Sequence, residues 1–129
     1  MAVGRTFEES LQKSIRMLDI GNDGLVLNRT SVSDEEIEEI ENHLLNADDR
    51  VLYYVAAAIR KGMSVEKIQK LSFIDPWFIE KIKNIVDVES TLQQKPLDKD
   101  LMRKAKHLGW WTLASKTQYC ETYVVLDTR

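Results

Sequence analysis

The residues with the clearest potential for chemistry are four neighbouring carboxylates, Asp34, Glu35, Glu36 and Glu38. Carboxylate oxygens are the ligands that hard cations such as Ca²⁺ prefer. The same stretch follows Ser33 and has the pattern of a helix start, where acids stabilise the positive end of the helix dipole. Because adjacent carboxylates on a helix point in different directions, we expect them to support the helix and not to bind a metal.

Other groups that bind metals or act as nucleophiles are scarce. His43 and His107 lie far apart in the sequence and have no companions at ligand spacing. Cys120 is the single cysteine, so an internal disulfide is excluded, and no histidine is placed to activate it. Gly21 and Gly24 lack the lysine of a phosphate-binding loop. We therefore expect no catalytic, cofactor-binding or metal-binding residue in this chain.

Two aromatic pairs suggest contacts with protein. Trp77 and Phe78 follow Pro76 at the start of an expected helix, and Tyr53 and Tyr54 lie in an apolar stretch. Aromatic side chains are favoured anchors at protein interfaces. They can equally pack between helices of their own chain, and both interpretations stay open at this point. The candidate interface residues are Trp77, Phe78, Tyr53 and Tyr54.

The helices that must position these residues have clear start signals. Capping residues precede six apolar stretches: Thr6 with Glu9, Ser33 with Glu36, Asp48 or Asp49, Ser64, Asp75 before Pro76, and Asp98. Glycine ends helices because it adopts the left-handed conformation without strain. The expected stops are Gly21 or Gly24, Gly62 and Gly109.

The apolar residues behind these caps recur at helical spacing. One such series is Phe7, Leu11, Ile15 and Leu18. Val51 to Ile59 is apolar nearly all round, which predicts a helix buried on most sides. Short links and the lack of a convincing strand before Gly109 predict an all-α fold, a compact bundle of about six short helices.

The chain changes character after residue 109. We expect residues 1–109 to form one helical domain. Residues 110–129 lose the helical period, and Thr122 to Leu126 favours a strand. Because a lone strand has no visible partner in this chain, the prediction is an irregular or strand-prone tail, with two alternatives: disorder, or pairing with a segment outside this chain.

Composition and charge exclude several partners. The net charge is −3, whereas nucleic acids and anionic membranes attract basic proteins. No apolar run reaches the ~20 residues that span a bilayer. The N-terminus lacks the apolar stretch of a signal peptide, and a single cysteine suits a reducing compartment. We expect a cytoplasmic protein without membrane or nucleic-acid partners.

A helix-turn-helix DNA-binding protein is the alternative function. The two helices joined by Ser72–Ile74 could form the motif, and the second would enter the major groove. Its first residues would be Pro76, Trp77 and Phe78, which cannot read bases by hydrogen bonding. The nearby lysines that could contact phosphate are Lys67, Lys70, Lys81 and Lys83.

Three ordered blocks of residues carry a family resemblance. They are Gly4 to Lys13 with Arg16, Leu18, Gly21 and Gly24; Arg50 to Val55 with Ala57, Arg60, Gly62, Ser64 and Val65; and Leu71, Ile74, Asp75, Trp77, Phe78, Ile82 and Glu89, followed by Leu101, Arg103, Lys106 and Gly109. Over about residues 3–109 these blocks resemble the oligomerisation domain of the carbamoyl phosphate synthetase large chain. Residues 110–129 depart from the family, which continues in helices there.

The resemblance implies a helical, non-catalytic module between two ATP-grasp halves, with residues 1–20 also forming the exit from the first half. The family makes carbamoyl phosphate from bicarbonate, two ATP, and ammonia that a glutaminase small chain releases from glutamine. ATP with Mg or Mn binds in the ATP-grasp halves, so no catalytic residue is carried over to this chain. The implied partners are those halves, the small chain and a second copy. The parent would be a ligase of arginine or pyrimidine biosynthesis.

Overall fold

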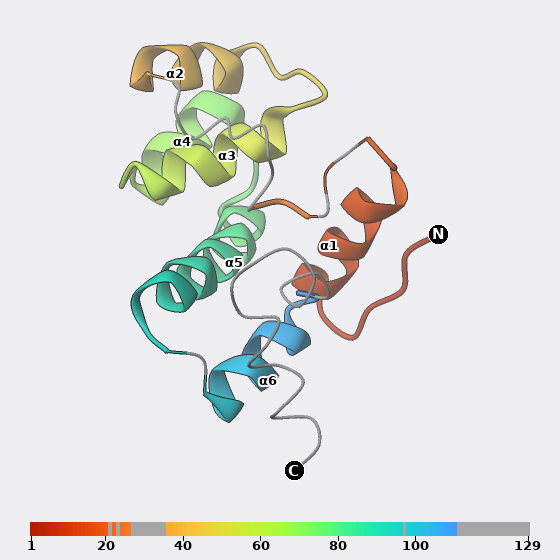
Figure 1. Cartoon of the computed structure of the whole chain (residues 1–129). Coiled ribbons are helices and arrows are strands. Elements are labelled where there is room, and N and C mark those ends of the chain that lie inside the picture. Colours follow the sequence, from red (N-terminus) through yellow and green to blue (C-terminus); the bar gives the residue numbers. More distant parts are fainter. Residues whose placement is uncertain (21, 23, 27–35, 97, 111–129) are drawn as a thin grey trace. The chain divides into compact units, whose positions relative to one another are not determined.

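The computed structural model describes residues 1–20, 22, 24–26, 36–96 and 98–110 of the 129-residue chain. Within these residues the chain forms helices and no strand. The helices are α1 (Phe7–Met17), α2 (Ile37–Leu45), α3 (Val51–Arg60), α4 (Val65–Ser72), α5 (Pro76–Gln94) and α6 (Lys99–His107) (Figure 1). This confirms the all-α fold that the spacing of the apolar residues predicts.

The chain divides into two compact units. Unit 1 consists of Met1–Gly24 and Val88–Arg129 and contains α1, the end of α5 and α6. Unit 2 consists of Leu25–Asp87 and contains α2, α3, α4 and the first part of α5. The predicted division into a helical domain of residues 1–109 and a separate tail stays a prediction, because residues 111–129 lie outside the described part.

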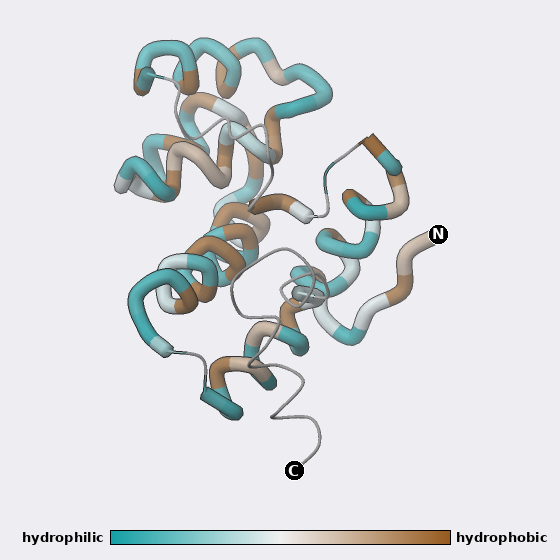
Figure 2. Tube along the Cα trace, in the orientation of Figure 1, coloured by the Kyte–Doolittle hydropathy of each residue, from teal (hydrophilic) through white to brown (hydrophobic). Residues whose placement is uncertain are grey.

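Unit 2 is built around α3, which contacts both α2 and α4. Ala56, Ala57 and Ala58 on α3 are buried, and their small side chains allow the neighbouring helices to approach closely. Ile40 of α2 and Ile68 of α4 are fully buried. Figure 2 shows hydrophobic residues along α3 and α5, in agreement with the prediction that the apolar stretch of α3 is buried on most sides.

In unit 1, the buried side of α1 is more polar than the sequence pattern predicts. On α1 the buried residues are Glu8, Gln12 and Ile15. The predicted stripe is therefore only partly right, since Leu18 is 64% exposed. The reason is that α1 ends at Met17, so Leu18 lies beyond the last full turn.

Four predicted N-terminal caps are confirmed by hydrogen bonds from backbone amides. The bonds run to Thr6 Oγ1 from the Glu9 amide (3.2 Å), to Ser64 Oγ from the Lys67 amide (3.3 Å), to Asp75 Oδ1 from the Trp77 amide (2.9 Å), and to Asp98 Oδ1 from the Leu101 amide (2.7 Å). Side-chain oxygens satisfy amides that have no partner in the first turn of a helix. Helices α1, α4, α5 and α6 therefore begin at the capping residues that the sequence predicts.

Two other helix starts differ in detail. The expected cap Ser33 lies outside the described residues, and α2 begins at Ile37 after Glu36, whose side chain accepts no capping bond. Asp48 Oδ1 accepts from the Arg50 amide at 2.8 Å, and α3 begins one residue later, at Val51. Asp48 therefore stabilises the turn that leads into α3 and is not the cap itself.

Three helix ends show how the chain leaves a helix. Gly62 and Gly109 adopt φ values of 82° and 84°, which confirms their predicted roles as stops. The expected stop of the first helix at Gly21 or Gly24 is wrong, because α1 ends earlier and Asp19 takes the left-handed conformation with φ 50°. Aspartate tolerates this region better than most residues.

Candidate assembly surface

Three aromatic residues are exposed around the link from α4 to α5: Phe73 follows the end of α4, and Trp77 and Phe78 lie in the first turn of α5. We call these three residues the aromatic surface. Their exposed fractions are 86%, 49% and 42%. All three belong to unit 2. Exposed aromatic residues are typical of protein contact sites.

The sequence at the start of α5 explains why two of these rings face outward. Asp75 caps the helix, and Pro76 occupies its first position, where no amide is needed. In the first turn of α5, the side chain of Ile79 is fully buried in the core, whereas Trp77 and Phe78 are partly exposed. The two rings meet edge to face, with centroids 5.0 Å apart and planes at 89°.

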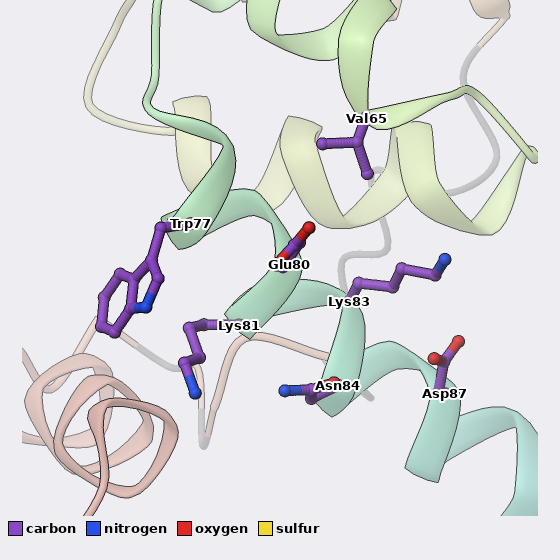
Figure 3. A pocket seen from close by; sticks show the side chains of 7 residues that line it. All are labelled: Val65, Trp77, Glu80, Lys81, Lys83, Asn84 and Asp87. Carbon is purple, nitrogen blue, oxygen red and sulfur yellow. The ribbon is translucent and has the colours of Figure 1, made fainter.

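A shallow groove of about 390 Å³ runs along α5 beside the aromatic surface. Its lining residues are Val65, Trp77, Glu80, Lys81, Lys83, Asn84 and Asp87. Figure 3 shows the indole of Trp77 and the side chain of Lys81 on one side of α5, while Lys83 extends to the other. Lys81 Nζ lies 5.3 Å from the centroid of the Trp77 ring, within the range of a cation–π contact.

The second predicted aromatic pair lies in a different environment. Tyr54 is only 3% exposed, and its ring stacks on His43 with centroids 4.0 Å apart. Tyr54 is therefore part of the core of unit 2. Tyr53 is half-buried, and its buried hydroxyl has no hydrogen-bond partner among the described residues. A role for Tyr53 and Tyr54 in assembly stays a prediction.

His43 connects α2 to the turn before α3. Its Nδ1 lies 3.1 Å from Asp48 Oδ2, while Asp48 Oδ1 accepts from the Arg50 amide. The hydrogen bond from the Arg50 amide holds the pKa of the Asp48 carboxyl below its ordinary value; desolvation opposes this effect, and the hydrogen bond with His43 adds a smaller lowering. Tyr54 stacks on the His43 ring and Asp48 accepts at its Nδ1, so this cluster ties α2 to α3 and to the turn before it within unit 2.

The candidate metal ligands of the sequence analysis do not come together in the described part of the chain. Among the described residues, no three His, Cys, Asp or Glu side chains are close enough to share an ion. Glu36 and Glu38 are exposed, whereas Asp34, Glu35 and Cys120 lie outside the described residues. His107 is exposed at the end of α6. None of the described helices is both long and apolar enough to cross a membrane.

The sequence analysis missed Phe73. The caps Ser64 and Asp75 place it in the link between two helices, which is a useful signal. The left-handed conformation at such a link, however, is normally marked by glycine or asparagine. A phenylalanine there gave no indication that its ring would be 86% exposed.

Comparison with known proteins adds a consistent set of relatives. The family model described as the carbamoyl-phosphate synthetase large chain, oligomerisation domain, matches residues 1–118. A carbamoyl phosphate synthase large chain from Archaeoglobus fulgidus is 45% identical over 119 residues, which cover 85% of this chain and 11% of the relative. One from Methanobrevibacter smithii is 42% identical over 127 residues, covering 96% of this chain and 11% of the relative.

A third relative is an N-terminal section of the same large chain. The N-terminal section of the carbamoyl phosphate synthase large chain from Aquifex aeolicus is 38% identical over 116 residues, covering 88% of this chain and 20% of the relative. The chain thus spans about a tenth to a fifth of the length of these relatives. None of these comparisons supports the DNA-binding alternative.

Proposed function

This chain belongs to the family of the carbamoyl phosphate synthetase large chain oligomerisation domain, and on that basis we propose that it is an assembly module that self-associates and has no catalytic site of its own. The observation that carries this proposal is the match over residues 1–118. The aromatic surface supports it, because an assembly module needs exposed apolar residues in addition to a core.

The mechanism that we propose is burial of apolar surface. Ile40, Ile68 and the alanines of α3 give unit 2 a core of its own. The partly exposed Trp77 and Phe78 then contribute to contacts with other molecules. A specific interface usually buries roughly 800 Å² on each partner. Loss of water from aromatic surface would supply most of the free energy of such a contact.

The reaction of the parent protein is part of the same proposal. We propose a parent that makes carbamoyl phosphate from bicarbonate, glutamine-derived ammonia and two ATP, in the cytoplasm. ATP with Mg or Mn would bind in ATP-grasp halves outside this chain, and a glutaminase small chain would supply the ammonia. In that setting this module would contact the flanking halves, and the parent would serve arginine or pyrimidine biosynthesis.

Sedimentation velocity over a wide range of protein concentration tests the self-association. We expect the weight-average sedimentation coefficient of the 129-residue chain to rise with concentration. A coefficient that stays at the monomer value throughout would contradict the proposal. As a control for the alternative function, we expect no retention on duplex DNA at low salt, since DNA binding by lysines would be strongest there.

A further inference from the structure

The first residues of the chain are tied to α1 by side chains of that helix. Lys13 Nζ donates to the Val3 carbonyl at 2.9 Å and to Glu9 Oε1 at 2.7 Å. Glu9 Oε2 accepts from the Arg5 amide at 2.9 Å. We call Val3–Arg5 the entry segment. Because the side chains of Val3 and Arg5 are exposed, burial contributes little to holding this segment on α1.

Gly4 brings the entry segment into close contact with the same helix. A β-carbon at this position would lie 2.6 Å from Ser10 Oγ and 2.7 Å from the Ser10 amide nitrogen, so a larger residue would push the segment away from α1. The hydrogen bond from Lys13, followed by that from the Arg5 amide, holds the pKa of the Glu9 carboxyl below its ordinary value. The carboxylate that binds both groups therefore stays charged at neutral pH.

The end of α6 is tied to α1 as well (Figure 1). We call Gly109–Trp110 the exit segment. The Trp110 amide donates to the Ala105 carbonyl at 3.1 Å, one of the two bonds of a Schellman motif. This turn presents the Gly109 carbonyl to α1, where Arg16 Nη2 donates to it at 3.0 Å across 93 positions of sequence. Both segments are therefore held by one helix of unit 1.

Glu9 takes part in both attachments. Its carboxylate binds the entry segment, and its Cα lies 3.1 Å from the position that a β-carbon of Gly109 would occupy. We propose that α1 couples the two segments, so that release of the entry segment loosens the exit segment and the reverse. A coupling between two sites is reciprocal by thermodynamic necessity. The coupling is a property of this chain alone, and only its role in a larger parent rests on the proposed function.

The geometry of α1 suits this role. Glu9, Lys13 and Arg16 recur at helical spacing, so their side chains lie along one side of the helix. A hydrogen-bonded helix of 11 residues is a rigid element, and such elements transmit a displacement from one end to the other. In a parent whose chain continues from both segments into larger bodies, α1 would make unit 1 a rigid joint instead of a flexible linker.

Amide hydrogen exchange of the monomeric chain, followed by NMR, tests the coupling. The Arg5 amide reports on the entry segment and the Trp110 amide on the exit segment, because each donates a hydrogen bond that holds its segment. Lys13→Met removes the bonds that Lys13 makes to the entry segment and to Glu9. We expect the Arg5 amide to exchange about two- to fivefold faster, the range for loss of a partly exposed ion pair. The Trp110 amide should exchange at least about twofold faster as well.

Two further variants approach the coupling from other directions. Arg16→Met removes the bond to the Gly109 carbonyl and should accelerate exchange of both reporter amides, whereas Arg16→Lys keeps a donor and should restore much of the protection. Gly4→Ala displaces the entry segment without changing any charge, because its β-carbon would collide with Ser10. We expect the Trp110 amide to exchange faster in Gly4→Ala too.

Arg103 provides a matched control. It forms an exposed ion pair with Asp100 on α6, with Nη1 3.8 Å from Oδ1, so Arg103→Met removes a cation from unit 1 without changing either attachment. Exchange of the Arg5 and Trp110 amides should be the same in this variant as in the natural chain. Faster exchange of both amides in Arg103→Met would overturn the assignment of the coupling to α1.

Two other patterns of exchange would contradict the proposal. One is acceleration confined to the altered attachment, with only Arg5 affected by Lys13→Met and only Trp110 affected by Arg16→Met. The other is equal acceleration of amides throughout α1, α5 and α6, because the whole unit would then have lost stability. Either result leaves the proposed self-association standing, since sedimentation tests it separately, and a natural chain that stays monomeric leaves the coupling standing.

Discussion

At the scale of single residues, two glycines adopt the same conformation in different surroundings. Gly62 has φ 82° and nothing within 4 Å of the position that a β-carbon would occupy. Gly109 has φ 84°, and a β-carbon there would lie 3.1 Å from Gln12 Cβ and from Glu9 Cα. Position 62 therefore favours glycine only because of its left-handed backbone. Position 109 favours glycine for the same reason and also because a β-carbon would crowd Gln12 and Glu9.

This difference predicts unequal effects of alanine. Gly62→Ala should lower the free energy of unfolding by about 1–2 kcal/mol through backbone strain. Gly109→Ala should lower it further, because its β-carbon also has to displace α1 backbone. Urea denaturation of the two variants under the same conditions measures both values. Equal losses would mean that the contact with α1 contributes nothing.

Asp48 predicts a dependence of stability on pH. Because the pKa of its carboxyl is lowered in the folded chain, mainly by the hydrogen bond from the Arg50 amide, the contribution of Asp48 to stability is present above the ordinary value of 3.8. That contribution is lost as the pH falls through the lowered pKa. We therefore expect Asp48→Ala to lower the melting temperature at pH 7 and the difference to shrink below 3.8. Thermal melts followed by circular dichroism over this range provide the measurement, and a difference that does not depend on pH would contradict the expectation.

At the scale of elements, α3 is defined by the small size of its buried residues. Ala56, Ala57 and Ala58 are at most 1% exposed, and α3 contacts both α2 and α4. Close packing of this kind has no room for larger side chains. The helix therefore depends on steric fit as much as on hydrophobicity.

Enlarging one of these alanines should destabilise unit 2. Ala57→Leu adds apolar surface, but we expect a loss of about 1–3 kcal/mol because the neighbouring helices must move apart. The exposed position Gln69 on α4 provides the control, since Gln69→Leu introduces the same side chain without burial. Chemical denaturation compares the two. A gain in stability for Ala57→Leu would show that a cavity lies beside α3.

At the scale of the whole molecule, the division into two units predicts where the chain opens. Ile68 is buried in unit 2 and Ile15 in unit 1. Truncating either to alanine should cost about 2–5 kcal/mol, the range for buried aliphatic side chains. Cavities act first on the cooperative unit that contains them.

Hydrogen exchange can locate these effects. For Ile68→Ala we expect faster amide exchange in α2, α3 and α4, and for Ile15→Ala faster exchange in α1 and α6. The two variants serve as controls for each other because the deleted groups are the same. Uniform acceleration in all the helices for both variants would mean that the chain unfolds as one cooperative unit.

The sequence by itself determined the features that depend on near neighbours. Thr6, Ser64, Asp75 and Asp98 accept bonds from amides two or three residues away, so their roles can be read without a fold. The apolar spacing was sufficient for the all-α class. The ordered blocks of residues were sufficient for the family, which the match over residues 1–118 confirms.

Tertiary structure decided which side chains are covered. Tyr54 and Trp77 are similar in character, yet Tyr54 is stacked on His43 in the core while Trp77 stands beside an open groove. Gln12 is buried on α1 although it is polar. Burial depends on which distant segment packs against a residue, and a local pattern contains no information about that segment. The exposure of Phe73 belongs to the same class, because it follows from how α4 ends and from what does not cover the turn within the described chain.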